Sequence, residues 1–226
     1  MNIIAFVPCR SGSERVPMKN TKDFGGISGG LLKIKLTQLL KVPLINTIVL
    51  STNDEEVIKI ATALDKRIVI DKRPENLATS ATSTDELINY VPEIIHEGHV
   101  LWTHVTSPFL DEQVYQKAIQ TYKKNLEEGI YDSLMTVNKI QTFLWNRKGS
   151  VNYDRNEEKW PRTQTLPELF EVNSGMFINT IENYRKFNDR IGKTPFLFET
   201  EGFNSFDIDW PDDFELGQLI YEKIHG

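Results

Sequence analysis

Short apolar runs alternate along the chain with segments in which apolar residues recur at helical spacing. Residues 3–7 and 45–50 are rich in β-branched side chains, which is typical of buried strands. Between them, residues 31–42 place leucines three and four positions apart, which predicts an amphipathic helix. The same reasoning predicts strands at 67–70, 99–104, 132–137, 174–178, 195–198 and 204–208, and helices at 54–64, 83–96, 111–128, 181–190 and 212–224. This repeated strand–helix order predicts a mostly parallel sheet with helices on both faces.

The alternation stops between Lys139 and Glu171. That stretch is polar, has no clear period and carries two tryptophans and two prolines. A long irregular segment inside a regular domain is usually functional, so we expect a hairpin-like excursion or a dimerisation arm. We expect residues 1–226 to form one domain, because no repeat or low-complexity tract divides the chain.

Composition excludes several classes of protein. The chain has 226 residues, of which 39% are hydrophobic and 26% charged, which is typical of a globular protein. Its net charge of −6 argues against a nucleic-acid or anionic-membrane partner. Its one cysteine, Cys9, rules out a Cys-based zinc site. The start of the chain lacks the pattern of a signal peptide, and no apolar run is long enough to span a bilayer, so we expect a cytoplasmic protein.

The segment Pro8–Asn20, which reads PCRSGSERVPMKN, follows the first predicted strand. Parallel α/β sheets bind their ligands at that edge. Ser-Gly-Ser lets backbone N–H groups face a ligand, and Arg10, Arg15 and Lys19 add positive charge, so the loop suits the phosphates of a nucleotide. It matches neither a Walker A loop nor a dinucleotide-binding turn, and a solvated basic loop is the alternative.

The segment Asp207-Ile208-Asp209 is the second candidate. On a strand, side chains two residues apart share a face, so both carboxylates would converge, and two carboxylates with substrate phosphates commonly hold Mg²⁺. Alternatively, Asp209 only helps to begin the following helix.

Charge is segregated along the chain. Residues 1–41 contain seven Lys and Arg against two acidic residues, whereas residues 199–215 contain seven acidic residues and no basic one. A basic loop and an acidic corner fit a small anionic substrate that arrives with a divalent cation.

Five segments, taken in this order, resemble the acylneuraminate cytidylyltransferases, which activate sialic acids as CMP-sugars. The loop PCRSGSERVPMKN is similar to the family's opening motif. The segments STNDEEV, RPENLATSATST, THVTSPF and FDIDWPDDF stand where the family has its later motifs. The resemblance runs nearly from end to end.

The resemblance implies a three-layer α/β/α sandwich of the nucleotide-diphospho-sugar transferase type, Rossmann-like, with residues 139–172 as an arm that forms a homodimer and covers the partner's active site. It implies CTP as co-substrate and Mg²⁺ as the metal. The catalytic residues would be Lys19, Arg10, Asp207 and Asp209, with the two aspartates as metal ligands. The nucleotide would contact Arg10, Ser11, Gly12, Ser13, Lys19, Asn20, Arg73, Ser80 and Ser83. The sugar acid would contact His104, Thr106, Ser107, Arg162, Gln164 and Asn173.

Departures from the family pattern gather on the sugar side. His104 stands where Gln is usual, Val105 where Pro is usual, Leu110 where Arg is common and Ser174 where Gly is common. The resemblance implies transfer of a cytidylyl group from CTP to a sialic-acid-type nine-carbon sugar acid, and the departures bear on the choice of sugar. The alternatives are pseudaminic, legionaminic or 3-deoxy-octulosonic acid as acceptor, a glycosyltransferase, or a non-catalytic nucleotide-binding module.

Overall fold

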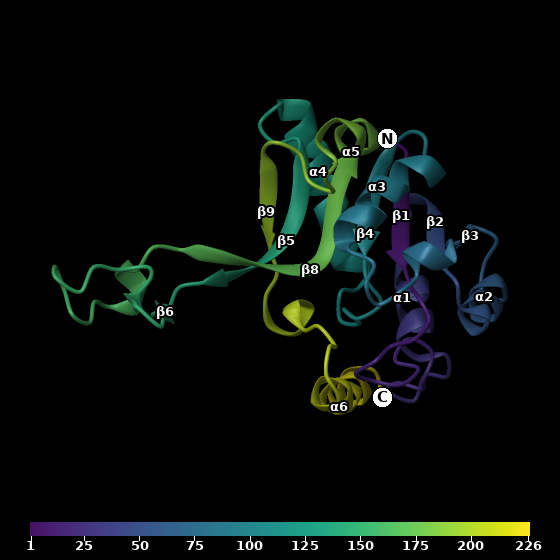
Figure 1. Ribbon diagram of the computed structural model, residues 1–226, viewed down its shortest axis with the longest axis horizontal. Helices are drawn as coiled ribbons and strands as arrows, with labels where there is room; N and C mark the ends of the chain where they lie inside the picture. The colour runs from purple at the N-terminus through teal and green to yellow at the C-terminus, as the bar shows by residue number, and fades with distance from the viewer.

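Seven strands form one sheet in the order β3-β2-β1-β4-β8-β5-β9 in the computed structural model, which describes residues 1–226 (Figure 1). Every neighbouring pair is parallel except the two that involve β8, which is antiparallel to both β4 and β5. The strands are β1 (Ile3–Pro8), β2 (Ile45–Thr52), β3 (Ile68–Lys72), β4 (His99–Thr103), β5 (Ser133–Ile140), β8 (Leu169–Thr180) and β9 (Pro195–Glu199). The predicted mostly parallel sheet is confirmed.

Helices cover both faces of this sheet, which gives the predicted three layers. They are α1 (Gly30–Leu40), α2 (Glu55–Thr62), α3 (Thr84–Ile94), α4 (Glu112–Glu128), α5 (Ile181–Phe187) and α6 (Pro211–His225). Helices α1, α2, α4 and α6 contribute to a core cluster of 31 buried residues on one face, whereas α3 and α5 contribute to a cluster of 10 on the other. No helix is both long and apolar enough to cross a membrane.

The helix starts follow from capping side chains. Asp54 accepts hydrogen bonds from the backbone N–H groups of α2, and Asp111 does the same for α4. Ser83 and Glu86 form a reciprocal capping box at α3. Each cap contributes about 1 kcal/mol, because it satisfies backbone donors that have no partner within the helix.

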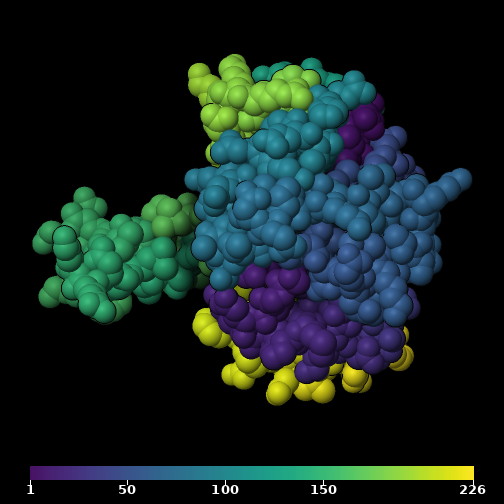
Figure 2. Space-filling model, turned by 45° about the vertical axis from the view of Figure 1, so that its right-hand side comes forward, coloured from purple at the N-terminus to yellow at the C-terminus, as the bar shows by residue number.

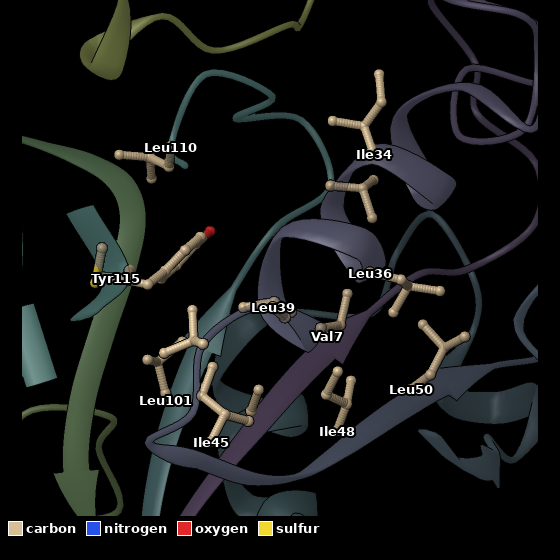
Figure 3. Close-up of a cluster of buried hydrophobic side chains, with 14 of the residues drawn as sticks. Val7, Ile34, Leu36, Leu39, Ile45, Ile48, Leu50, Leu101, Leu110 and Tyr115 are labelled. Atoms are coloured by element: carbon tan, nitrogen blue, oxygen red, sulfur yellow. The ribbon is translucent and has the colours of Figure 1, made fainter. Parts of the chain in front are cut away.

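The larger core is built from α1 on β1 and β2 (Figure 3). Leu36 and Leu39 of α1 pack toward Val7 of β1 and Ile48 of β2, and all four side chains are fully buried. Burying a side chain of this size stabilises the fold by about 2 kcal/mol. This packing fixes the carboxyl end of β1, from which the basic loop departs.

The polypeptide between β5 and β8 leaves the sheet as a projection. The two strands stay paired out to Ile140 and Leu169, and the chain between them stands away from the body of the molecule (Figure 1). This projection includes the short hairpin of β6 (Trp145–Asn146) and β7 (Gly149–Ser150). In it, the rings of Trp145 and Trp160 stack with centroids 6.3 Å apart.

The expectation of a strand at 204–208 is wrong. After β9 the chain forms a single turn of 3-10 helix at Gly202–Ser205 and then runs without a strand partner to α6. Ile208 is fully buried, and its N–H donates to the carbonyl of Thr106 over 2.9 Å. The alternating apolar pattern therefore reflects a segment that packs onto the core without joining the sheet.

Candidate active site

A cavity of about 400 Å³ opens where β1 and β4 end. Its walls come from the loop after β1, the segment after β4 and the chain just before α6. Figure 2 shows the N-terminal segment (purple) at the surface, between blue segments of the first half of the chain and the yellow C-terminal segment. The cavity brings together eight of the residues predicted from sequence: Arg10, Ser13, Lys19, Asn20, Ser80, His104, Thr106 and Asp209.

The loop after β1 is held by hydrogen bonds to its own backbone. The Arg10 guanidinium donates to the carbonyls of Ser11 and Gly12 over 3.1 and 3.0 Å. Asn20 donates to the carbonyl of Arg10, and the Ser11 N–H donates to the side chain of Asn53. Ser11 and Gly12 do not line the cavity, and their contacts instead fix the curve of the loop.

Lys19 joins this loop to the acidic segment before α6. Its Nζ donates to the carbonyl of Ile208 over 2.7 Å and lies 3.8 Å from Oδ1 of Asp209. Arg15 pairs with the same oxygen at 3.3 Å. Burial lowers the pKa of Lys19, and the neighbouring Asp209 opposes that shift. The basic and acidic ends of the chain therefore meet at one place.

Asp207 and Asp209 both line a second cavity of about 360 Å³, and Asp209 lines the first cavity as well. The carboxylate that caps α6 belongs to Asp213, which accepts from the N–H groups of Asp209 and Trp210. The Asp209 side chain is therefore not the helix cap. Burial raises the pKa of Asp207, and a hydrogen bond from Thr106 opposes the shift.

Two carboxylates alone do not complete a metal site. No group of three or more His, Cys, Asp or Glu side chains is placed to hold a metal ion. A partly desolvated carboxylate beside a second one nevertheless favours a bound cation, because the cation offsets both burial and mutual repulsion. The donor set fits Mg²⁺, with the other oxygens supplied by substrate and water.

His104 accepts a hydrogen bond at Nε2 from the indole N–H of Trp102 over 3.0 Å. Burial, reinforced by the positive charge of Arg190, lowers the pKa of His104 to about 3. The ring is therefore neutral at physiological pH, and its proton sits on Nδ1. His104 lines the first cavity, and Nδ1–H is its remaining hydrogen-bond donor.

Besides Ser11 and Gly12, three more residues predicted to contact substrate in the body of the domain line neither cavity. Arg73 is buried and donates to the side chain and carbonyl of Ser51 over 3.0 and 2.7 Å. Ser83 caps α3, and Ser107 is buried with its carbonyl accepting from Lys35. In this structure the three residues shape the loops around the cavity.

The other residues predicted to contact the sugar acid lie at the second cavity and in the projecting arm. Asn173 lines the second cavity beside Asp207. Arg162 and Gln164 lie in the projecting arm and line neither cavity of their own chain (Figure 1).

Sequence reasoning missed three residues near the site. Asn138 lines the second cavity, Thr200 accepts a hydrogen bond from Asn173, and Lys35 donates to the carbonyls of Ser107 and Leu110 after β4. Lys35 interrupts the leucine-rich face of α1, and a lysine on the buried stripe of a helix was the available signal. Asn138 and Thr200 carried no signal, since polar residues at strand ends are ordinary.

The chain resembles known proteins over nearly its whole length. A family model described as cytidylyltransferase matches residues 4–225. The chain is 22% identical to the pseudaminic acid cytidylyltransferase of Campylobacter jejuni, over all of this chain and 98% of that protein. It is 26% identical to the N-acylneuraminate cytidylyltransferase of Escherichia coli, over 98% of this chain and 52% of that protein. The structure of a CMP:2-keto-3-deoxy-manno-octonic acid synthetase complexed with CTP superposes with a TM-score of 0.69 at 14% identity, covering 99% of this chain and all of that one.

Proposed function

Since the chain belongs to the cytidylyltransferase family and is a nucleotidyltransferase, we propose that it activates a sialic-acid-type nine-carbon sugar acid with CTP. The anomeric hydroxyl would attack the α-phosphorus, the bond to the β-phosphate would break, and pyrophosphate would leave. The observation that carries this proposal is the meeting of the basic loop and the acidic corner at Lys19 and Asp209.

The basic loop would bind the triphosphate. Arg10, Ser13, Lys19 and Asn20 face the first cavity, and their donors suit phosphate oxygens. As negative charge moves onto the leaving pyrophosphate, fixed cations at Arg10 and Lys19 stabilise the transition state more than the ground state. Ser80, from the loop before α3, also lines this cavity. Arg73 and Ser83 would act by holding the loop that carries Ser80.

Asp207 and Asp209 would hold Mg²⁺, which when bound neutralises phosphate charge and lowers the pKa of an attacking hydroxyl. In the protein itself, Thr106 orients Asp207, and Lys19 and Arg15 pair with Asp209 at the junction of the two cavities. The reaction then depends on positioning and charge, with no side-chain nucleophile.

The sugar acid would occupy the second cavity and the adjoining part of the first. His104, Thr106 and Asn173 border this space. Arg162 and Gln164 would reach the substrate only from a second copy, so the proposal includes a homodimer in which each arm covers the partner's site. The expected cytoplasmic location is part of the same proposal.

Pseudaminic acid is the second candidate substrate. It is favoured by the relative named pseudaminic acid cytidylyltransferase, which aligns over all of this chain and 98% of its own length. Legionaminic and 3-deoxy-octulosonic acids stay within the same reaction class, and a module that binds CTP without turning it over is the alternative outside it.

Pyrophosphate release from CTP and Mg²⁺ over a panel of these sugar acids tests the proposal. We expect turnover with a nine-carbon acid and none without a sugar acid. Asp212, in the first turn of α6, supplies a matched control for the Asp209→Ala variant, because it is an exposed acid that lines neither cavity. Asp212→Ala should keep wild-type turnover. Silence across the whole panel while CTP still binds would favour the non-catalytic module.

A further inference from the structure

A buried lysine lies beneath the segment that follows β4. Lys35 of α1 is fully buried, and its Nζ donates to the carbonyls of Ser107 and Leu110 and to the Tyr115 hydroxyl, over 2.8, 3.4 and 2.6 Å. All three ammonium protons are therefore used on neutral oxygens. Figure 3 shows the Tyr115 hydroxyl directed toward the α1 side of the cluster.

The hydrogen bonds continue from Tyr115 to the middle of the sheet. Thr103 of β4 donates its one hydroxyl proton to the carbonyl of Gly175 over 2.7 Å. The Tyr115 hydroxyl, 2.8 Å from the Thr103 oxygen, must then be the donor of that pair. The result is a series of hydrogen bonds that all point in one direction. It runs from Lys35 to Tyr115, from Tyr115 to Thr103, and from Thr103 to the carbonyl of Gly175 in β8.

This series of hydrogen bonds ends at a bulge in β8 that borders the second cavity. The register of β5 against β8 shifts between Met135 and Val137, opposite residues 173–176, and Ser174 has a left-handed backbone with a φ of 57°. Asn173 donates to the side chains of Asn138 and Thr200 over 2.6 and 2.5 Å. The bulge is thus held by β4 on one side and by β5 and β9 on the other.

Stability alone does not account for this arrangement. Burial lowers the pKa of Lys35 to about 7, which reports the penalty of keeping an ammonium in the core. An apolar side chain of similar length, such as methionine, would fill the same space without that penalty. The ammonium instead fixes the segment after β4 relative to the bulge in β8, and both segments border the cavities.

We propose that Lys35, Tyr115 and Thr103 are positioning residues for the sugar acid. They fix the segment that carries Thr106 relative to the bulge that carries Asn173, and both of those residues line the cavities. This inference rests on the proposed function, because it concerns the acceptor of the same reaction. The loop after β1 is held by contacts of its own, so we expect Lys35, Tyr115 and Thr103 to act chiefly on the sugar acid.

Helix α4 offers a matched pair of variants. Tyr115 and Tyr122 are both buried tyrosines, two turns apart, and Tyr122 bonds His99 at the far end of β4. Tyr115→Phe should raise the KM for the sugar acid by about three- to tenfold, the effect of one net hydrogen bond, and leave the KM for CTP unchanged. Tyr122→Phe should leave both KM values unchanged, even if it lowers the melting temperature as much.

Thr103 supplies a rescue test. Thr103→Val keeps the shape but loses the hydroxyl, and it should reproduce the effect of Tyr115→Phe. Thr103→Ser keeps the hydroxyl and should restore most of the sugar-acid affinity. Equal effects of Tyr115→Phe and Tyr122→Phe, or parallel increases in both KM values, would overturn the positioning role. Failure of the wild type to turn over any acid would instead overturn the proposed function, and the positioning role with it.

Discussion

The neutral state of His104 makes the stability of the fold depend on pH in a measurable way. The pKa of the ring falls from 6.5 to about 3 on folding, because burial and the nearby Arg190 disfavour the charged form. Between these values the unfolded chain binds a proton at His104 that the folded protein does not. The unfolded state is therefore favoured increasingly as pH falls from 6.5 toward 3.

The size of the effect follows from one proton. A difference of one bound proton changes the free energy of unfolding by about 1.4 kcal/mol per pH unit. Between pH 6 and pH 4 the contribution of His104 amounts to about 2–3 kcal/mol. His104→Gln removes this titration, keeps a polar side chain of similar size and introduces the residue usual in the resembled family. We expect the variant to gain that amount relative to wild type over the same interval.

Urea unfolding at half-unit pH steps from 4 to 7 measures this difference, because titrations common to both proteins cancel in the comparison. His96→Gln is the control, since it makes the same replacement at an exposed position, and its curve should follow the wild type. Parallel curves for wild type and His104→Gln would refute a neutral His104 and the proton assignment that depends on it.

Three further predictions concern the site and the fold. Asp209→Ala should lower kcat by about 10²–10³ with unchanged circular dichroism, because it removes the partner of Lys19 and Arg15 and a proposed metal ligand, and normal turnover would contradict that assignment. Added EDTA should stop pyrophosphate release and excess Mg²⁺ should restore it, whereas unchanged release in EDTA would exclude a metal requirement. Gly30→Ala should destabilise the protein by about 3 kcal/mol or more in urea unfolding, because Gly30 has a φ of 49° and an added Cβ would clash with the carbonyl oxygen of Lys22. Gly26→Ala, with a φ of 74° but open space around the Cβ, should lose only about 1 kcal/mol, and equal losses would show that the clash at Gly30 is relieved.

Sequence periodicity placed most elements because local forces set them. Strands β1 and β2 are short segments rich in β-branched residues, and helices begin at Asp54, Ser83 and Asp111, whose side chains cap them. Such signals act within a few residues and therefore survive in a single sequence. The wrongly predicted strand at 204–208 depended on a non-local condition instead. Its alternation is real, but whether an alternating segment pairs depends on a free strand edge elsewhere in the fold.

By itself, the sequence determined the alternation of strands and helices, the basic loop after the first strand and the separation of basic and acidic ends along the chain. Only the tertiary structure decided that these ends meet, through Lys19, Ile208 and Asp209. It also decided that Arg73 and Ser83 support loops, and that Lys35 anchors a hydrogen-bond chain to the β8 bulge. The physical reason is that burial and partner choice depend on residues far apart in sequence. A charged side chain binds ligand, pairs with another residue or stabilises a loop according to what folding places beside it.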